Sequence, residues 1–306
     1  PGVPHSEPLV ARDLENAGFV YTGAPASAIA IAQDKAETRE LLSRHGILTP
    51  EGRIFRRAVA DGWQRYPAIV KAAWEHGSQG LCRKSVVVNE RELLSRIEYI
   101  FDTFRQPALV EDFIDGREFH VSLVGNGRLE IFPVVEMDYS GLRDFHDHLC
   151  SYEAKLVPGS RLYRGIRTVV PAPLTKDELA RLEAVCHQAY RAVGCRDYGR
   201  IDVRQRDGRY YVLDVNPNAD MSADASLAYA AEVAGYSYGQ LVSRIVRLAA
   251  HRHDWRHAAS GQSRSRAGAA KPKARHRGPS RRPGSSSRRR SALPLVRAGA
   301  TGSGKS

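Results

Sequence analysis

The chain has 306 residues, of which 42% are hydrophobic, and a formal net charge of +12. This length fits roughly two domains, and the apolar content suffices for a packed core over most of the chain. There is no run of about eighteen apolar residues, which excludes a membrane-spanning helix of the usual length.

The positive charge belongs to the end of the chain. Fourteen of the 46 Lys and Arg residues lie after Trp255, and none of the 34 Asp and Glu residues does. Residues 1–255 therefore carry 32 basic and 34 acidic residues. The body of the protein is therefore nearly neutral. Residues 256–306 are rich in Arg, Ser, Gly and Pro, and we predict that they form a disordered basic tail.

The cysteines and the start of the chain bear on the compartment. The four cysteines form no Cys-x-x-Cys pair, which favours reduced thiols and a cytoplasmic protein. The chain begins at Pro1 without a charged and then apolar leader, so we expect no signal peptide and expect that preceding residues are missing.

The first half of the chain predicts a mixture of helices and strands. Residues 1–23 contain a short helix-like stretch, too small for a domain of its own. A helix is expected over 34–46, where Asp34 can cap the N-terminus. Strand-like apolar runs and one further helix follow: strands at 68–72, 85–88, 107–111 and 119–124, and a helix at 90–105.

The second half contains two hairpin signals. Gly125-Asn126-Gly127 predicts a turn into a strand over 129–137, and Arg206-Asp207-Gly208 predicts a turn between two later strands. The remaining elements are expected to be strands at 151–156, 197–205 and 209–215, and helices at 175–194, 223–234 and 238–250. Hairpins mixed with helices indicate an α+β or mixed-sheet architecture.

Polar side chains alternate along the two strands joined by the second hairpin. Arg200 and Asp202 lie in the first strand, and Asp214 and Asn216 lie in the second. Alternate residues of a strand share a face, so the hairpin should bring the two pairs together. Carboxylate and amide oxygens suit Mg²⁺, and Arg offers a fork of donors for a charged oxygen. We expect a site for Mg²⁺ and phosphate; the simpler alternative is a solvated strand surface with a salt bridge.

These two strands, with the sequences GRIDV and LDVNP, resemble the metal-binding hairpin of ATP-grasp ligases. In that family an Arg-x-Asp pattern is followed by Glu-x-Asn, and two Mg²⁺ ions are held against the ATP phosphates. The resemblance implies that Asp202, Asp214 and Asn216 bind the metal ions, with Mn²⁺ as an alternative metal. It also implies that Arg200 stabilises the oxyanion of the transition state. Asp214 is one methylene shorter than the usual Glu.

Further segments resemble ATP-grasp motifs in the family's order. Lys35 resembles a lysine at the start of a helix that reaches the nucleotide phosphates, and Lys71 resembles the strand lysine that reaches the α- and β-phosphates. The segment 75–80 resembles the glycine-rich loop over the phosphates, and 110–114 resembles the hinge strand at the adenine edge. Glu118 resembles the Glu that binds the ribose hydroxyls.

Tyr152-Glu153-Ala154-Lys155 is close to a signature of D-alanine–D-alanine ligases, in which the lysine approaches the γ-phosphate. The resemblance implies a set of ATP-binding residues and a set of catalytic residues. The ATP-binding residues are Lys35, Lys71, Gly77, Ser78, Glu111, Asp112, Phe113, Ile114, Glu118 and Lys155, and the catalytic residues are Arg200, Lys155 and Ser78.

Because these segments follow one order over residues 33–217, the chain resembles the D-alanine–D-alanine ligase-like branch of the ATP-grasp superfamily. The resemblance implies two α+β subdomains with mixed or antiparallel sheets that hold ATP between them. Residues 1–30 would be the remnant of a preceding domain, and 31–255 the ATP-grasp domain. Its central subdomain would cover about 50–125, and its C-terminal subdomain about 126–255.

The same resemblance implies an ATP- and Mg²⁺-dependent ligase that joins a small-molecule carboxylate to an amine through an acyl phosphate. It also implies a homodimer, because members of the family are often dimers. Substrate recognition departs from the family. Asp220 stands in a glycine position, Ala225 rather than Ser226 in a serine position, and Leu156 where a Tyr commonly stands. The substrates are therefore left open, and a genuine D-alanine–D-alanine ligase of peptidoglycan synthesis is the alternative.

The tail carries two weaker signals. Residues 299–306 match the P-loop pattern after a strand-like 293–296, but a P-loop needs a following helix and a sheet, so we expect no activity there. The Arg-rich 280–291 resembles a phosphate-contacting tract, although we favour a solvated linker and expect no nucleic-acid partner. The alternative of another class is a nucleic-acid-associated protein with a vestigial ATP-grasp core. Salt-sensitive nucleic-acid binding that requires 256–306, without ATP turnover, would distinguish it.

Overall fold

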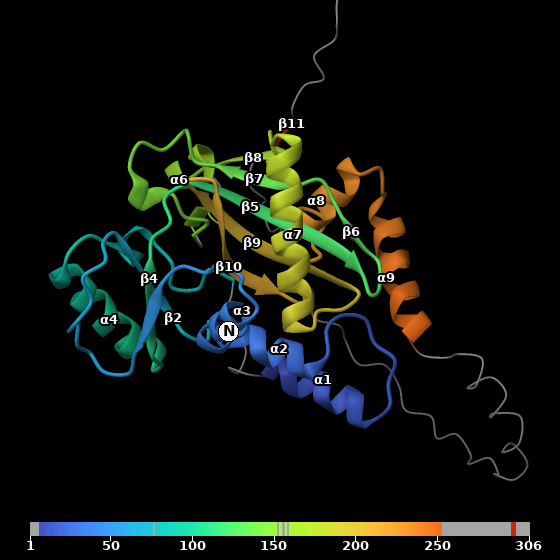
Figure 1. Cartoon of the computed structure of the whole chain (residues 1–306), viewed down its shortest axis with the longest axis horizontal. Helices are drawn as coiled ribbons and strands as arrows, with labels where there is room; N and C mark the ends of the chain where they lie inside the picture. Colours follow the sequence, from blue (N-terminus) through green and yellow to red (C-terminus); the bar gives the residue numbers. More distant parts are fainter. Residues whose placement is uncertain are drawn as a thin grey trace, which may run out of the picture.

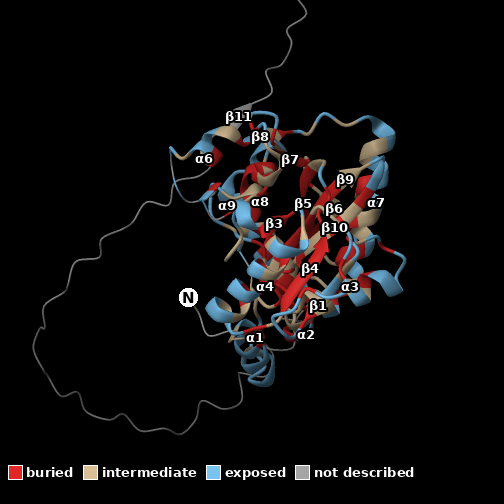
Figure 2. Cartoon of the chain, turned by 90° about the vertical axis from the view of Figure 1, so that its left-hand side faces the viewer, coloured by how far each residue is buried: buried red, intermediate tan, exposed pale blue. Residues whose placement is uncertain are grey.

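A computed structural model describes residues 6–75, 77–151, 153–154, 157, 159–252 and 295–297. Two β-sheets, each packed against helices, make up this part of the chain (Figure 1). Buried residues concentrate in the strands and on the inner faces of the helices (Figure 2).

The smaller sheet has four strands in the order β1-β4-β2-β3. Its strands are β1 (Gly52–Phe55), β2 (Ala68–Ala72), β3 (Val86–Val87) and β4 (Ala108–Asp112). Helix α4 (Glu90–Phe104) packs on this sheet through Leu93, Ile97 and Ile100, which are spaced for one helical face and fully buried. Asn89 caps the helix by accepting a bond from the Glu92 N–H at 2.9 Å.

The larger sheet has the order β10-β9-β5-β7-β8-β11, with β6 paired to β5. Its strands are β5 (Arg117–Gly125), β6 (Leu129–Ile131), β7 (Val135–Asp138), β8 (Arg167–Val170), β9 (Tyr198–Arg206), β10 (Arg209–Asn216) and β11 (Leu295–Arg297). The pairs among β5 to β10 are antiparallel, and β11 pairs with β8 in parallel.

Helices cover both faces of the larger sheet (Figure 1). Helix α7 (Lys176–Val193) lies across β9 and β10, and α8 (Ser226–Val233) and α9 (Tyr238–Arg252) contact β5. Thr175 and Glu178 form a capping box that starts α7. The shorter helical elements are α6 (Arg161–Gly165) and the 3₁₀ turns Arg83–Ser85 and Phe145–Asp147.

Three helices precede the first strand: α1 (Ser6–Asn16), α2 (Ala26–Gln33) and α3 (Lys35–Arg44). The segment between α1 and α2 is bonded to both ends of the β9–β10 hairpin. The Gly23 N–H donates to Asp197, which precedes β9, at 2.9 Å, and the Ala24 N–H donates to Asn218, which follows β10, at 2.9 Å. These bonds fix the N-terminal helices against the larger sheet.

Strand alternation gives β5 and β9 one apolar and one polar face. Phe119, Val121 and Leu123 of β5 are buried in the core that includes α7. The intervening residues Glu118, His120 and Ser122 face away from that core, as the period of two along a strand requires. This polar face is the one on which the cleft described below is built.

Most predicted elements are confirmed, and the differences have local causes. The helices at 34–46, 90–105 and 175–194 and both hairpins are present. The single strand predicted over 129–137 is wrong, because it divides into β6 and β7 on either side of Pro133, which has no N–H to donate to a ladder.

The strand predicted over 151–156 is also wrong. Glu153 and Ala154 are helical, and Ser151 accepts a bond from the Ala154 N–H at 3.2 Å, a contact typical of a helix cap. The prediction missed α2, β1, α6, β8 and the two 3₁₀ turns. Of the predicted tail, only residues 295–297 are described, as β11; the P-loop-like segment lies outside the described residues.

Neutralising Asp197 should destabilise the protein. Its buried carboxylate accepts from the Gly23 N–H at 2.9 Å and from Asn126 Nδ2 at 3.0 Å, and pairs with Arg252. Asp197→Asn preserves the shape and tolerates the backbone φ of 63°, so it mainly removes charge-assisted bonds. We expect the free energy of unfolding in urea to fall by about 1.5–3 kcal/mol.

Asp207→Asn is the matched control for this measurement. Asp207 also has a positive φ, of 53°, but it lies exposed in the β9–β10 turn. Its substitution should change stability by less than about 0.5 kcal/mol. Equal effects of the two substitutions would contradict the structural role of Asp197.

Candidate functional site

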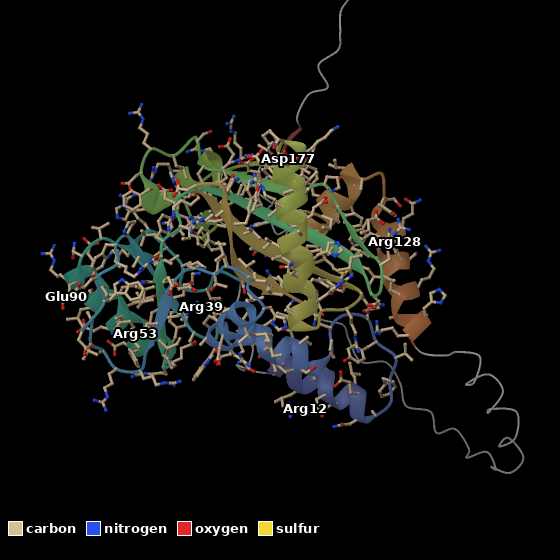
Figure 3. All side chains as sticks on the ribbon, in the orientation of Figure 1. Arg12, Arg39, Arg53, Glu90, Arg128 and Asp177 are labelled. Atoms are coloured by element: carbon tan, nitrogen blue, oxygen red, sulfur yellow. The ribbon has the colours of Figure 1, made fainter. Side chains whose placement is uncertain are left out.

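A cleft lies between the two sheets and encloses about 880 Å³, including its opening to solvent. Both sheets, helix α3 and the loops at 75–81 and 149–150 contribute to its lining. Among the residues labelled in Figure 3, Arg39 of α3 lies where α3 meets the smaller sheet, and Glu90 and Arg128 lie on the outside.

The β9–β10 hairpin places its polar residues on one face. Asp214 lies opposite Asp202, and Asn216 lies opposite Arg200. The Arg200 guanidinium donates to both oxygens of Asp202, at 2.6 and 2.9 Å, and Asn216 Nδ2 donates to Asp202 at 3.2 Å. The predicted convergence of these four side chains is therefore present.

This convergence depends on a bulge that the sequence analysis did not foresee. The register of the hairpin shifts between Val212 and Asp214, so that Leu213 is an extra residue in β10. Without the bulge, Leu213 would lie opposite Asp202, and Asp214 would point into the core. The spacing of Val212 and Val215, both buried in the core at an interval of three residues, is the sequence signal that could have revealed it.

The neighbouring strand β5 extends the polar face. Its register places Glu118 opposite Arg204, His120 opposite Asp202, and Ser122 opposite Arg200. Polar residues at positions 118, 120 and 122 thus continue the surface formed by positions 200, 202 and 204. Alternation from Asp202 along β9 and from Glu118 along β5 could have identified Arg204 and His120, which the sequence analysis missed.

Glu118 is the buried anchor of this surface. One of its oxygens accepts from Arg204 Nε at 2.8 Å and from the Tyr139 hydroxyl at 2.8 Å, and the other lies 3.4 Å from His120 Nε2. Burial raises the pKa of Glu118, but the Arg204 charge and His120 lower it by more, so the net pKa falls below its ordinary value. Arg204 also donates to the Ile114 carbonyl at 2.8 Å. This bond connects the hinge, residues 110–114, to the floor of the cleft, which the polar face of β5 and β9 forms.

Two lysines lie at the other side of the cleft. Lys71 of β2 pairs with Glu111 of β4 at 2.8 Å, and Arg39 pairs with the second oxygen of Glu111 at 3.2 Å. Lys35 lies half-buried at the start of α3, where its ammonium donates to the Glu75 carbonyl. Burial lowers the pKa of Lys35, the Lys71 charge lowers it further, and Asp214 and Glu111 oppose the shift. An anionic ligand would relieve the repulsion between the lysines.

The loop at 77–80 closes part of the cleft. Gly77 and Ser78 both have positive φ, of 64° and 65°, and Ser78 Oγ donates to the Cys150 carbonyl at 2.7 Å. The hinge residue Asp112 is bonded to Arg65, with Nε–Oδ1 at 2.7 Å.

The cleft brings together nearly all of the predicted ATP-binding residues. Those that line it are Lys35, Lys71, Gly77, Ser78, Glu111, Asp112, Phe113, Ile114 and Glu118. Of the predicted metal ligands, Asp202 and Asp214 line the cleft, and Asn216 contacts Asp202. The predicted catalytic residue Arg200 also contacts Asp202. Lys155 lies outside the described residues.

The donors on the hairpin fit a hard divalent cation. Asp202, Asp214 and Asn216 offer the oxygen atoms that Mg²⁺ prefers, and rotation of the Asn216 amide would turn its oxygen toward such an ion. Asp214 lines the cleft, and within the described part of the chain it makes no salt bridge of 4 Å or less. The acidic pair therefore lines the same cleft as Lys35 and Lys71.

Comparison with solved structures identifies the fold. A D-alanine–D-alanine ligase from Bacillus anthracis complexed with ATP superposes with a TM-score of 0.62 at 22% identity, over 79% of this chain and 74% of that chain. The VanG D-Ala:D-Ser ligase from Enterococcus faecalis gives a TM-score of 0.65 at 22% identity, over 78% and 68%. The protein has the ATP-grasp fold, as the sequence predicted.

Sequence comparison identifies the family. The family model described as D-ala D-ala ligase C-terminus matches residues 44–247. A D-alanine–D-alanine ligase from Syntrophotalea carbinolica is 33% identical over 76% of this chain and 71% of its own length. An uncharacterised protein, y4sG, from Sinorhizobium fredii is 33% identical over 78% and 69%. The chain belongs to the D-alanine–D-alanine ligase family, whose members are ATP-dependent ligases that form C–N bonds.

Two further findings concern the cysteines and the apolar character of the helices. None of the four cysteines takes part in a disulfide. A search of the described residues finds no helix with the length and apolar character needed to cross a membrane.

Removing the charge of Glu118 should cost stability in a pH-dependent way. Because the folded-state pKa lies below the ordinary 4.5, the carboxylate stabilises the fold above that pH and loses this effect as the pH falls. At pH 7 we expect Glu118→Gln to lower the free energy of unfolding by about 1.5–3 kcal/mol.

The gap between wild type and Glu118→Gln should then narrow as the pH falls below 4.5, measured by urea unfolding at a series of pH values. Glu98→Gln, on the exposed side of α4, is the matched control and should show no such trend. A gap that stays constant from pH 7 to pH 3 would contradict the ion-pair role of Glu118.

Proposed function

We propose that this protein uses ATP to activate a small-molecule carboxylate as an acyl phosphate, which an amine then attacks, with loss of phosphate from a tetrahedral intermediate. The observation that carries this proposal is the opposition, within one cleft, of Lys35 and Lys71 to the acidic pair Asp202 and Asp214. Positioning and charge stabilisation dominate such phosphoryl transfer, since little covalent chemistry falls to the protein.

Each group on the cleft wall has a proposed role. Lys35 and Lys71 bind phosphate oxygens, the hinge from Glu111 to Ile114 borders the adenine, and Glu118 accepts from the ribose hydroxyls. Ser78 and the Gly77 backbone cover the phosphates, where the loop already contacts the cleft floor. Lys155 completes the phosphate contacts in this proposal.

Asp202, Asp214 and Asn216 would hold Mg²⁺, for which we propose two ions, with Mn²⁺ as an alternative. When bound, these ions supply positive charge beside the phosphate oxygens. Arg200 has a proposed catalytic role as the donor to the oxyanion. Burial opposes its charge, but Asp202 more than offsets this and raises the pKa of Arg200, so it remains a cation at any physiological pH.

The segment that follows the β9–β10 hairpin supports a second substrate that differs from D-alanine. Ala225 caps α8 without a side-chain bond, and Ser226 Oγ is bonded to His120 Nδ1 at 3.0 Å. Asp220 accepts from the N–H and the hydroxyl of Ser222, at 2.8 and 2.7 Å. We infer that recognition of the second substrate differs from that in relatives with serine and glycine at these positions.

Ligation of two D-alanines is the second candidate, and it is favoured by the 33% identity to a D-alanine–D-alanine ligase over 76% of the chain. A phosphate-release screen of the full-length protein over D- and L-amino acids and small peptides would separate the candidates. Release with D-alanine alone would favour the second candidate, and release with a different pair the first.

The organisation and context of the protein remain proposals. We propose three parts: a domain remnant at 1–30, an ATP-grasp domain at 31–255 and a tail at 256–306. We also propose that the protein is cytoplasmic and forms a homodimer. Gel filtration with light scattering would test the dimer.

Arg200→Ala should suppress ligation while ATP still binds. Loss of one donor to a developing oxyanion costs about 2.7–4 kcal/mol in the barrier, which corresponds to a rate lower by about 10²–10³. Phosphate release with the substrate found in the screen and nucleotide binding by calorimetry measure the two effects. Arg209→Ala, an exposed residue of the same hairpin, is the control. Near-normal turnover of Arg200→Ala would remove Arg200 from the mechanism.

Asp214→Asn should weaken nucleotide binding only in the presence of Mg²⁺. The substitution keeps the shape of the side chain but removes one anionic ligand, so we expect ATP affinity with Mg²⁺ to fall by at least about tenfold. Calorimetry with and without Mg²⁺ measures it, and Asp102→Asn, exposed on α4, is the control. Unchanged Mg²⁺-dependent affinity would exclude Asp214 as a ligand.

A further inference from the structure

Three side chains of different chemistry meet on the floor of the cleft, apart from the hairpin donors. They are Glu118 and His120 of β5 and Cys150 of the following loop, and their ligand atoms lie within 4.8 Å of one another. All three line the cleft. None of the roles proposed above uses His120 or the Cys150 thiol.

The spacing of these atoms suits a tetrahedral metal site. His120 Nε2 lies 3.4 Å from a Glu118 oxygen. Two ligands at about 2.0–2.1 Å from a tetrahedral zinc ion are about 3.3 Å apart, so this pair already has the separation of two ligands. A sulfur at about 2.3 Å from the same ion would lie about 3.5 Å from these two ligand atoms, and Cys150 Sγ lies within 4.8 Å of both, so it needs to move inward by about 1.3 Å at most.

The orientation of the imidazole is fixed from behind. Ser226 Oγ lies 3.0 Å from His120 Nδ1, which directs Nε2 toward Glu118. Histidine ligands of metals are commonly held in this way, with the second ring nitrogen bonded to a neighbouring polar group. The Ser226 contact therefore prepares His120 to bind through Nε2.

One carboxylate oxygen of Glu118 accepts hydrogen bonds from its neighbours, and the other is directed toward His120, where the metal would lie. Arg204 and Tyr139 both donate to the same oxygen, and the other faces His120. The Tyr139 hydroxyl also lies 3.3 Å from Cys150 Sγ, so the thiol is held near the carboxylate. On binding, the Cys150 thiol loses its proton to solvent, and the thiolate and carboxylate charges balance a dication.

We propose that Glu118, His120 and Cys150 bind a zinc ion or a cation of similar softness. A thiolate and an imidazole select such metals, whereas the all-oxygen set on the hairpin selects Mg²⁺. His120 lies opposite Asp202 in the β5–β9 ladder, so the two sets are adjacent and differ in the metal they prefer. A fourth position on the cleft side is left for water.

Zinc in this position would compete with the nucleotide, and this consequence rests on the proposed function. Glu118 cannot both ligate zinc through its second oxygen and accept from a ribose, and the ion would occupy the floor of the cleft. The protein would then be inhibited by zinc at concentrations near the dissociation constant of this site.

Cobalt titration of the full-length protein tests the site without reference to activity. Co²⁺ replaces zinc in such sites, and a cysteine ligand gives an intense thiolate-to-cobalt absorption in the near ultraviolet. We expect this band in wild type, its loss when excess Zn²⁺ is added, and no change with excess Mg²⁺. Cys150→Ser should abolish the band, and His120→Gln should weaken cobalt binding by at least about tenfold.

Cys82→Ser is the matched control, because Cys82 is an exposed thiol on the loop after the glycine-rich segment. This variant should keep the band. Absence of the band in wild type, or its persistence in Cys150→Ser, would overturn the proposal.

The competition is tested by nucleotide binding with and without Zn²⁺. Zinc should weaken ATP binding more in wild type than in Cys150→Ser; chelation of zinc by ATP in solution affects both proteins equally. Equal weakening in the two would overturn the competition while leaving the cobalt result intact. If ATP fails to bind wild type without zinc, the proposed function fails, and the cobalt band still decides the metal site.

Discussion

The buried ion pair between Arg204 and Glu118 is the interaction on which the cleft depends. Arg204 bonds Glu118 across the β5–β9 ladder, donates to the Ile114 carbonyl of the hinge and reaches the His148 carbonyl. Its guanidinium also lies over the rings of Phe113 and Tyr139. One cation therefore connects the larger sheet, the hinge between the sheets and the loop that carries Cys150. Removing either partner would leave an unpaired charge in the interior, which is why such a pair holds its surroundings in one arrangement.

From this anchor the charges of the cleft are arranged by strand period and register. Glu118, His120 and Ser122 face Arg204, Asp202 and Arg200, and the apolar residues between them fill the core under α7. Lysines come from the smaller sheet and from α3, so cations and carboxylates approach the same space from different elements. The separation of charge across the cleft, more than any single residue, makes it suited to a metal-bound phosphate chain.

Much of the fold and of the cleft lining could be predicted from the sequence, because both follow from local rules. Asp34 caps α3, Asn126 and Gly127 turn the β5–β6 hairpin, and alternation marks the polar faces. The failures required information from elsewhere in the chain. Pro133 divided a strand, Ser151 started a helix in place of a strand, and His120 gained its significance only from Cys150, thirty residues away. The partners of Arg204 could not be assigned before the hinge and the sheet were placed together.

The extra residue at Leu213 has a consequence for how this family's sequences vary. The bulge absorbs one residue, so that Asp214 and Asn216 lie opposite Asp202 and Arg200 on the cleft face. Loss of Leu213 would leave a regular ladder with Asp214 still opposite Asp202, whereas insertion of one residue between the bulge and Asp214 would place Asp214 opposite Ile201, on the core face. This strand therefore tolerates a shortening by one residue at the bulge better than a lengthening by one.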